Sequence, residues 1–167
     1  NYGYLNVQAR EGYELEQSTR FKEVLNQYLD ASFADISKQV HIAWYCISLS
    51  SARVLPYDLD NIELILKEKN IPVCVVFTQC DIDDINGTDA KRLTDVVSKR
   101  FGRNVPCFQT SNNEEVNELL DIEKLVDWSI KNLSDENLRM GFLIAQKADL
   151  QKKEELIQGK IKIYMGL

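Results

Sequence analysis

The sequence predicts an α/β fold, in which helices sandwich a parallel sheet and a C-terminal helical extension follows. Segments with strand and helix patterns alternate along the chain, which implies right-handed crossovers between parallel strands. The run Val73–Phe77 is apolar at every position rather than at alternate ones. Such a run is typical of a strand buried on both faces, so it predicts the centre of the sheet.

The first elements follow from hydrophobic spacing. Tyr4–Ala9 has a strand pattern, and a helix is expected over about 16–36. The run Val40–Leu49 predicts a second buried strand. Asp58 is expected to be the N-cap of a helix that extends to Lys69. The face of the first helix that we expect to be buried consists of Phe21, Val24, Leu25, Tyr28, Leu29, Phe33 and Ile36.

A turn is expected at Asp83–Gly87, because Asp, Asn and Gly are the residues that turns favour. Thr88 or Asp89 is expected to cap a helix over about 90–100. Gly102 is the usual terminating residue for that helix.

A short strand is predicted at Val105–Gln109, and Pro106 places it at an edge because proline cannot donate to a ladder. Two helices complete the pattern, over about 122–133 and about 136–164, and Ser134 or Asp135 is expected to cap the second.

The composition limits the classes of function. The 167 residues suit one domain with an appended helix, so we assign residues 1–133 to the domain and 134–167 to a C-terminal helix. A net charge of −6 disfavours nucleic acid as a partner. The sequence has no apolar run near 18 residues and no signal-peptide pattern, so a cytoplasmic protein is expected. The four cysteines lack a CxxC pair, which favours buried free thiols over zinc.

Two polar clusters follow neighbouring predicted strands, Thr78–Asp81 and Thr110–Asn112. Ligands of parallel sheets bind at the carboxyl ends of strands, so a planar ligand is expected between these clusters. The Asp81 carboxylate can accept two parallel hydrogen bonds, from N1–H and the 2-amino group of guanine. Adenine lacks that donor pair. Backbone N–H groups of Ser111 or Asn112 are candidates to meet the guanine O6.

These motifs resemble those of P-loop GTPases of the translation-factor superclass, close to the Era-like GTPases with a helical C-terminal extension. Thr78-Gln79-Cys80-Asp81 is similar to the family's Asn/Thr-Lys-x-Asp base motif, and Thr110-Ser111-Asn112 is similar to its Ser-Ala-Lys motif. Ala9-Arg10-Glu11-Gly12 resembles Asp-x-x-Gly. The resemblance implies GTP or GDP as ligand, with Mg²⁺ in the intact parent. It implies guanine contacts from Thr78, Gln79, Asp81, Thr110, Ser111 and Asn112, and switch-like roles for Ala9 and Gly12.

The sequence also departs from that family. No G-x-x-x-x-G-K-[ST] phosphate loop occurs in it. Ala9 replaces an aspartate that helps to hold magnesium, and Gln79 replaces the lysine that packs on the base. Phosphoryl transfer depends on positioning the phosphates, so we expect no GTP hydrolysis by this chain and millimolar guanine binding or none. The chain does not begin with methionine and stops just after a strong helix, so we expect it to be a piece of a longer protein.

Other interpretations of these residues remain open. Asp81 is either a base reader or an ordinary loop or cap carboxylate, and Thr110 and Ser111 form either a base loop or a simple turn. Gly12 is either a switch residue or a loop glycine. Arg53 either contacts a phosphate or effector or is solvated, and His41 is expected to be structural.

Three functions compete at this stage. The first is the base-recognition half of a GTPase-like domain, the second a pseudo-GTPase scaffold for protein interaction, and the third another α/β binding domain of the response-regulator or flavodoxin type. The family's first strand would lie between the strands at Tyr4–Ala9 and Val40–Leu49. Without it, the two strands close up, a second copy pairs with the exposed edges, or the N-terminal segment is displaced. We favour dimerisation or rearrangement. Membrane association is expected only through a region after this chain.

Overall fold

The computed structural model describes residues 14–35, 38–117 and 119–145. The chain divides into two compact units, Asn1–Leu125 and Val126–Leu167. The strand expected at Tyr4–Ala9 and the switch-like residues Ala9 and Gly12 lie outside the described residues.

The first unit contains a three-stranded sheet in the order β1-β2-β3. The strands are β1 (Ala43–Ser48), β2 (Val73–Thr78) and β3 (Cys107–Gln109), and both pairs are parallel. Parallel pairing with a helix in each connection confirms the α/β class predicted from the sequence. Within the described residues, β3 lies at an edge, as Pro106 predicted.

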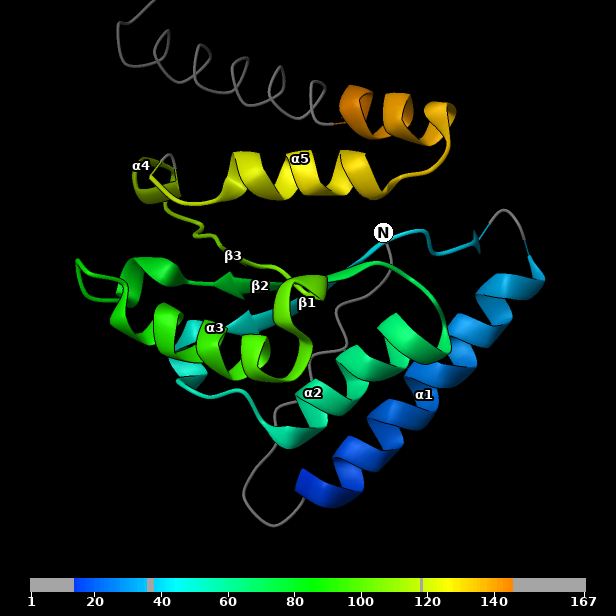
Figure 1. Cartoon of the computed structure of the whole chain (residues 1–167), viewed down its shortest axis with the longest axis horizontal. Coiled ribbons are helices and arrows are strands. Elements are labelled where there is room, and N and C mark those ends of the chain that lie inside the picture. Colours follow the sequence, from blue (N-terminus) through cyan, green and yellow to red (C-terminus); the bar gives the residue numbers. More distant parts are fainter. Residues whose placement is uncertain (1–13, 36–37, 118, 146–167) are drawn as a thin grey trace, which may run out of the picture. The chain divides into compact units, whose positions relative to one another are not determined.

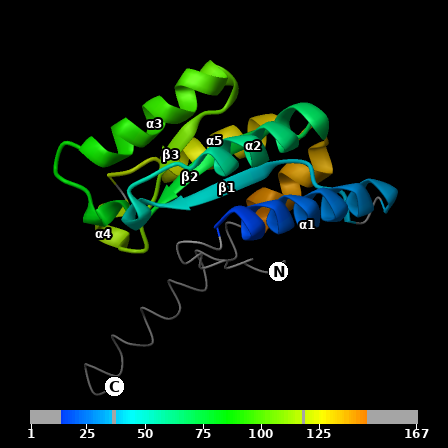
Figure 2. The same cartoon turned by 90° about the horizontal axis from the view of Figure 1, so that it is seen from below.

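Three helices lie on one face of this sheet, in the order in which they occur along the chain (Figures 1 and 2). They are α1 (Glu14–Ala34), α2 (Pro56–Glu63) and α3 (Thr88–Phe101). Two right-handed crossovers in the same direction place α2 and α3 on the same side. The main core forms between this face and the helices, and its members include Leu29, Ile47, Ile62, Ile65, Val73, Val75, Phe77, Leu93 and Val97.

The strand β2 is buried at its first five positions, and only Thr78 is partly exposed. This confirms the central position predicted from its continuous apolar run. The expected burial of the strand Val40–Leu49 is confirmed for Ile47 and Leu49 and was wrong for Trp44 and Cys46. Only Ala43–Ser48 is a strand, and Trp44 and Cys46 lie on the face of β1 opposite to Ile47. Cys74 and Val76 are their partners in the sheet register and are buried, so the exposed part of this face is at β1.

The helix α1 buries a narrower face than its apolar spacing predicted. Leu29 is fully buried, and Leu25 packs against the same core. Val24, Tyr28 and Phe33 are exposed. These three side chains flank the buried centre of the helix on either side, so the apolar arc is wider than the surface that α1 buries.

The start of α2 corrects the predicted cap. The helix begins at Pro56, and Leu55 is its N-cap, because proline is favoured at the first helical position. Asp58 lies in the first turn, where its Oδ2 accepts the Leu55 N–H at 2.8 Å. A π-helical turn, η3 (Leu64–Glu68), continues the helix, and Asn70 ends it in the left-handed region with φ 53°.

The cap of α3 was also predicted wrongly. Neither Thr88 nor Asp89 caps the helix. The Asp84 carboxylate accepts from the Thr88 N–H at 3.0 Å and from its hydroxyl at 2.6 Å. Asp83 accepts the N–H groups of Asp89 and Ala90 at 3.2 and 2.9 Å. The aspartates of the preceding turn therefore satisfy the free donors at the start of α3.

Further helices are α4 (Glu114–Asn117), which the sequence did not predict, and α5 (Ile122–Asn132), which it did. Residues 136–145 are helical, and the rest of the long helix expected there lies outside the described residues. Asp135 caps this helix through the N–H groups of Asn137 and Leu138, at 2.8 and 3.1 Å. Among the described helices, none combines the length and apolarity needed to cross a membrane.

Candidate functional site

The two polar clusters predicted from the sequence lie next to each other at the carboxyl edge of the sheet. Thr110 joins them: its N–H and its Oγ1 both donate to the Phe77 carbonyl, at 2.8 and 3.1 Å. In return, the Cys80 N–H donates to the Thr110 carbonyl at 3.0 Å. The end of β2 and the loop after β3 are thus fixed to each other by backbone contacts.

Asp81 is in direct contact with Ser111. Asp81 belongs to a 3₁₀ turn, η4 (Cys80–Ile82), and its side chain is exposed. The Ser111 hydroxyl, which is buried, donates to Asp81 Oδ1 at 2.5 Å. The same hydroxyl accepts the Asn113 N–H at 3.0 Å. Ser111 therefore holds the carboxylate at the edge of the sheet, while Asn112 beside it is exposed.

Gln79 is held from the other side of β2. Its backbone is left-handed, with φ 60° and ψ 36°, and its side chain is exposed. The Ser48 hydroxyl, at the end of β1, donates to Gln79 Oε1 at 2.5 Å. Ser48 is opposite Thr78 in the sheet register, so parallel pairing alone brings it beside Gln79. Gln79 and Asp81 are therefore each held by a serine that lies at or just after the end of a neighbouring strand.

The edge of the sheet around these residues is rich in carboxylates. Burial raises the pKa of the Cys80 thiol, and the charges of Asp83, Asp121 and Asp81 raise it further. Asp121 is paired with Lys124 at 2.6 Å, and Asp83 accepts two backbone N–H groups of α3. Asp81 is the exposed carboxylate of the three.

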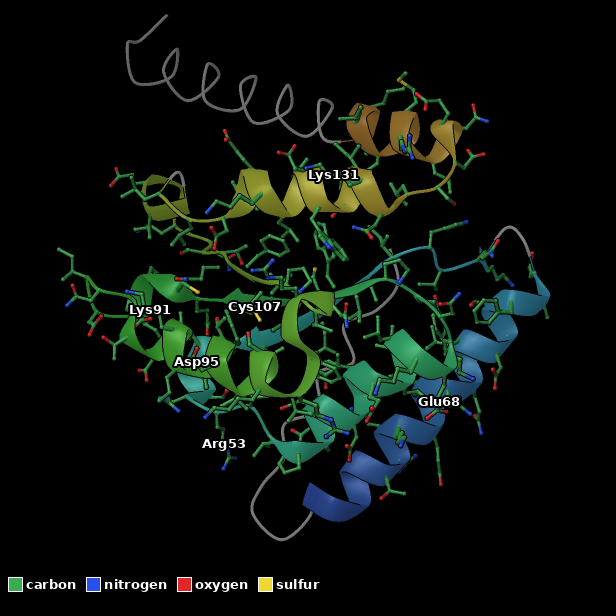
Figure 3. The ribbon with its side chains drawn as sticks, viewed as in Figure 1. Arg53, Glu68, Lys91, Asp95, Cys107 and Lys131 are labelled. Carbon is green, nitrogen blue, oxygen red and sulfur yellow. The ribbon has the colours of Figure 1, made fainter. Side chains whose placement is uncertain are left out.

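Arg53 lies on the loop after β1 and points outward (Figure 3).

A polar group beside this loop links β1 to α2. Burial raises the pKa of the Asp58 carboxyl; its hydrogen bonds to the Leu55 N–H and the Tyr45 hydroxyl, and the Arg53 charge, oppose this effect. The Tyr45 hydroxyl donates to Asp58 Oδ1 at 2.9 Å and accepts from Asn61 at 3.3 Å, so this polar group links β1 to α2.

The cysteines are all free thiols. Cys74 and Cys80 are buried, whereas Cys46 is exposed, so the expectation that the thiols are buried is wrong for Cys46. Burial raises the pKa of Cys74 to about 12. Among the residues that the structure describes, no group of three or more His, Cys, Asp or Glu side chains has an arrangement suited to a metal ion.

The structure thus brings together the six described residues for which guanine contacts were predicted, Thr78, Gln79, Asp81, Thr110, Ser111 and Asn112. Sequence reasoning missed Ser48, which contacts Gln79 across 31 positions of the chain. One feature of the sequence pointed to Ser48: it lies at the polar end of a predicted strand. Neighbouring parallel strands end at the same edge of a sheet, so Ser48 could have been placed near the two clusters.

No family model matches the chain, and comparison with curated proteins and with solved structures gave no match either. What is established for the first unit is therefore its class, an α/β domain with a three-stranded parallel sheet.

Proposed function

We propose that this chain is the base-recognition half of a guanine-nucleotide-binding domain and that it does not hydrolyse GTP by itself. The observation that supports this most directly is the carboxylate of Asp81. It stands at the end of the buried strand β2 and is held there by Ser111 at 2.5 Å. A fixed, exposed carboxylate at this edge suits the paired N–H donors of guanine.

The electrostatics support binding of a base rather than of phosphates. The exposed Asp81 carboxylate can accept N–H donors and repels a phosphate group. The sequence also has no phosphate-loop motif to supply backbone donors and a lysine. Binding through the base alone leaves out the contacts that give nucleotides most of their affinity. We therefore expect dissociation constants on the order of millimolar.

The test is an NMR titration of the chain with GDP, guanosine and ADP. We expect GDP and guanosine to shift the resonances of Asp81 and Ser111 with similar affinities, and ADP to shift neither. Asp81→Ala should abolish the shifts. Asp95→Ala removes the same charge from an exposed position on α3 and should leave them unchanged. Equal responses to ADP and GDP would overturn the proposal, and so would micromolar GDP binding with guanosine inactive.

A pseudo-GTPase scaffold is the second candidate, and one observation favours it. The side chains of Gln79 and Asp81 are both hydrogen-bonded within the chain, to Ser48 and Ser111. A site whose polar groups already have hydrogen-bond partners is stable without a ligand, because no donor or acceptor is left unsatisfied. Failure of guanosine and GDP to bind at 10 mM, roughly tenfold above the expected constant, would favour this candidate.

A further inference from the structure

The side chain of Gln79 is oriented by a chain of hydroxyl groups. Ser48 Oγ lies 2.5 Å from Gln79 Oε1 and 2.7 Å from Ser50 Oγ. The amide oxygen has no hydrogen, so Ser48 must use its single proton to donate to Gln79. Ser50 must therefore donate to Ser48. The hydrogen bonds therefore run from Ser50 through Ser48 to Gln79, because each hydroxyl has a single proton to donate.

This relay restrains the Gln79 side chain, because its amide oxygen is held at the end of β1. The left-handed backbone at Gln79 removes this residue from the regular alternation of the strand. The residue two positions further on is Asp81, which Ser111 holds. Two serines from the flanking strand ends thus fix an amide and a carboxylate that are close in the chain.

We infer that Ser48 is a positioning residue of the base site, which restrains the Gln79 amide so that a guanine ring read by Asp81 can stack on it. This inference rests on the proposed function. An unrestrained glutamine side chain loses rotamer freedom when it packs on a ligand, whereas a restrained one has already lost it. Removing the Ser48 hydroxyl should therefore weaken guanosine and GDP binding about three- to tenfold, without changing the preference for guanine over adenine.

The test compares Ser48→Ala with Ser51→Ala by NMR titration with GDP and guanosine. Ser51 is a matched control, because its hydroxyl contacts the carbonyls of Ser48 and Arg53 rather than Gln79. Ser48→Ala should weaken binding and Ser51→Ala should not. Ser48→Thr keeps a hydroxyl and should bind with the affinity of the wild type. If Ser48→Ala does not fold, Ser48→Thr and Gln79→Ala are compared instead.

A double-mutant cycle supplies the decisive readout. If Ser48 acts through Gln79, Ser48→Ala should have no effect on affinity in a Gln79→Ala background. Additive effects, or a Ser48→Ala variant that binds GDP like the wild type, would overturn the role of Ser48 and leave the proposed function standing. Absence of GDP and guanosine binding by the wild type at 10 mM, roughly tenfold above the expected constant, would instead overturn the proposed function and the role of Ser48 with it.

Discussion

The Ser111 hydroxyl serves two partners at once, because it donates to Asp81 Oδ1 at 2.5 Å and accepts the Asn113 N–H at 3.0 Å. A single buried side chain therefore orients the candidate base reader and stabilises the turn that leads into α4. The site and the local fold depend on the same residue.

Ser111→Ala should destabilise the domain by about 1–2 kcal/mol, because the Asn113 N–H loses its acceptor in a partly buried place. Urea unfolding measures this change. Asn112→Ala, at the exposed neighbouring position, should change the free energy of unfolding by less than about 0.5 kcal/mol. Similar values for the two variants would show that the Ser111 hydroxyl does not stabilise this turn.

Asp81→Asn should change the preferred base from guanine to xanthine. Xanthine has a carbonyl where guanine has its 2-amino group, so an amide can donate to that carbonyl and still accept the N1–H. We expect roughly a tenfold or larger reversal of preference. Competition between guanosine and xanthosine, followed by saturation-transfer NMR, measures it. An unchanged preference would show that Asp81 does not read the base edge.

Gln79→Lys should strengthen GDP binding. Under the proposed function, lysine is the residue expected at this position of the base motif, and an ammonium group over an aromatic ring contributes about 0.5–2 kcal/mol. The corresponding gain is roughly two- to thirtyfold in the dissociation constant from calorimetry. Gln79→Met has a similar length but no charge, and serves as the control. Equal affinities of the two variants would contradict a stacking role for this position.

Asp83→Ala should destabilise the chain by about 1–2 kcal/mol, because the N–H groups of Asp89 and Ala90 lose their acceptor. Asp95→Ala on the same helix is the control and should have little effect, since this side chain is exposed. Thermal unfolding followed by circular dichroism compares the two. A larger effect of Asp95→Ala would contradict the capping role of Asp83.

Stability should depend on pH through Asp58. Burial raises the pKa of this carboxyl above its ordinary value of 3.8, so the folded chain binds the proton more tightly than the unfolded chain does. This contribution to stability is present below pH 3.8 and is lost as pH rises through the folded pKa. Asp58→Asn should flatten the dependence in that window. Urea unfolding at a series of pH values checks it, and an unchanged profile would exclude Asp58 as its origin.

The predictable part of this fold is the part set by local pattern. Val73–Phe77 is apolar at every position, and this alone identified the central strand. The cap of α3 could not be chosen from sequence, because Asp83, Asp84 and Thr88 are all good capping residues. The choice depends on how the turn before the helix folds back, with Gly87 at φ 63°.

The candidate site was predictable for the residues after β2 and β3, and the contact from β1 was missed. Asp81 and Ser111 follow predicted strands and were both named. Ser48 was missed because its contact with Gln79 depends on the register between β1 and β2, which no local pattern specifies. The exposure of Trp44 and Cys46 was missed for a related reason: an apolar strand is buried only if another element covers each face.

The exposure of Trp44 provides an optical probe. Its side chain is 41% exposed on β1, and the only other tryptophan in the chain is Trp128. In a Trp128→Phe variant, the wavelength of the fluorescence emission would report the polarity around Trp44 on β1 alone. Any second copy, partner or segment that covers this strand would shift the emission to the blue. Assembly at the first strand can therefore be followed in solution without a label.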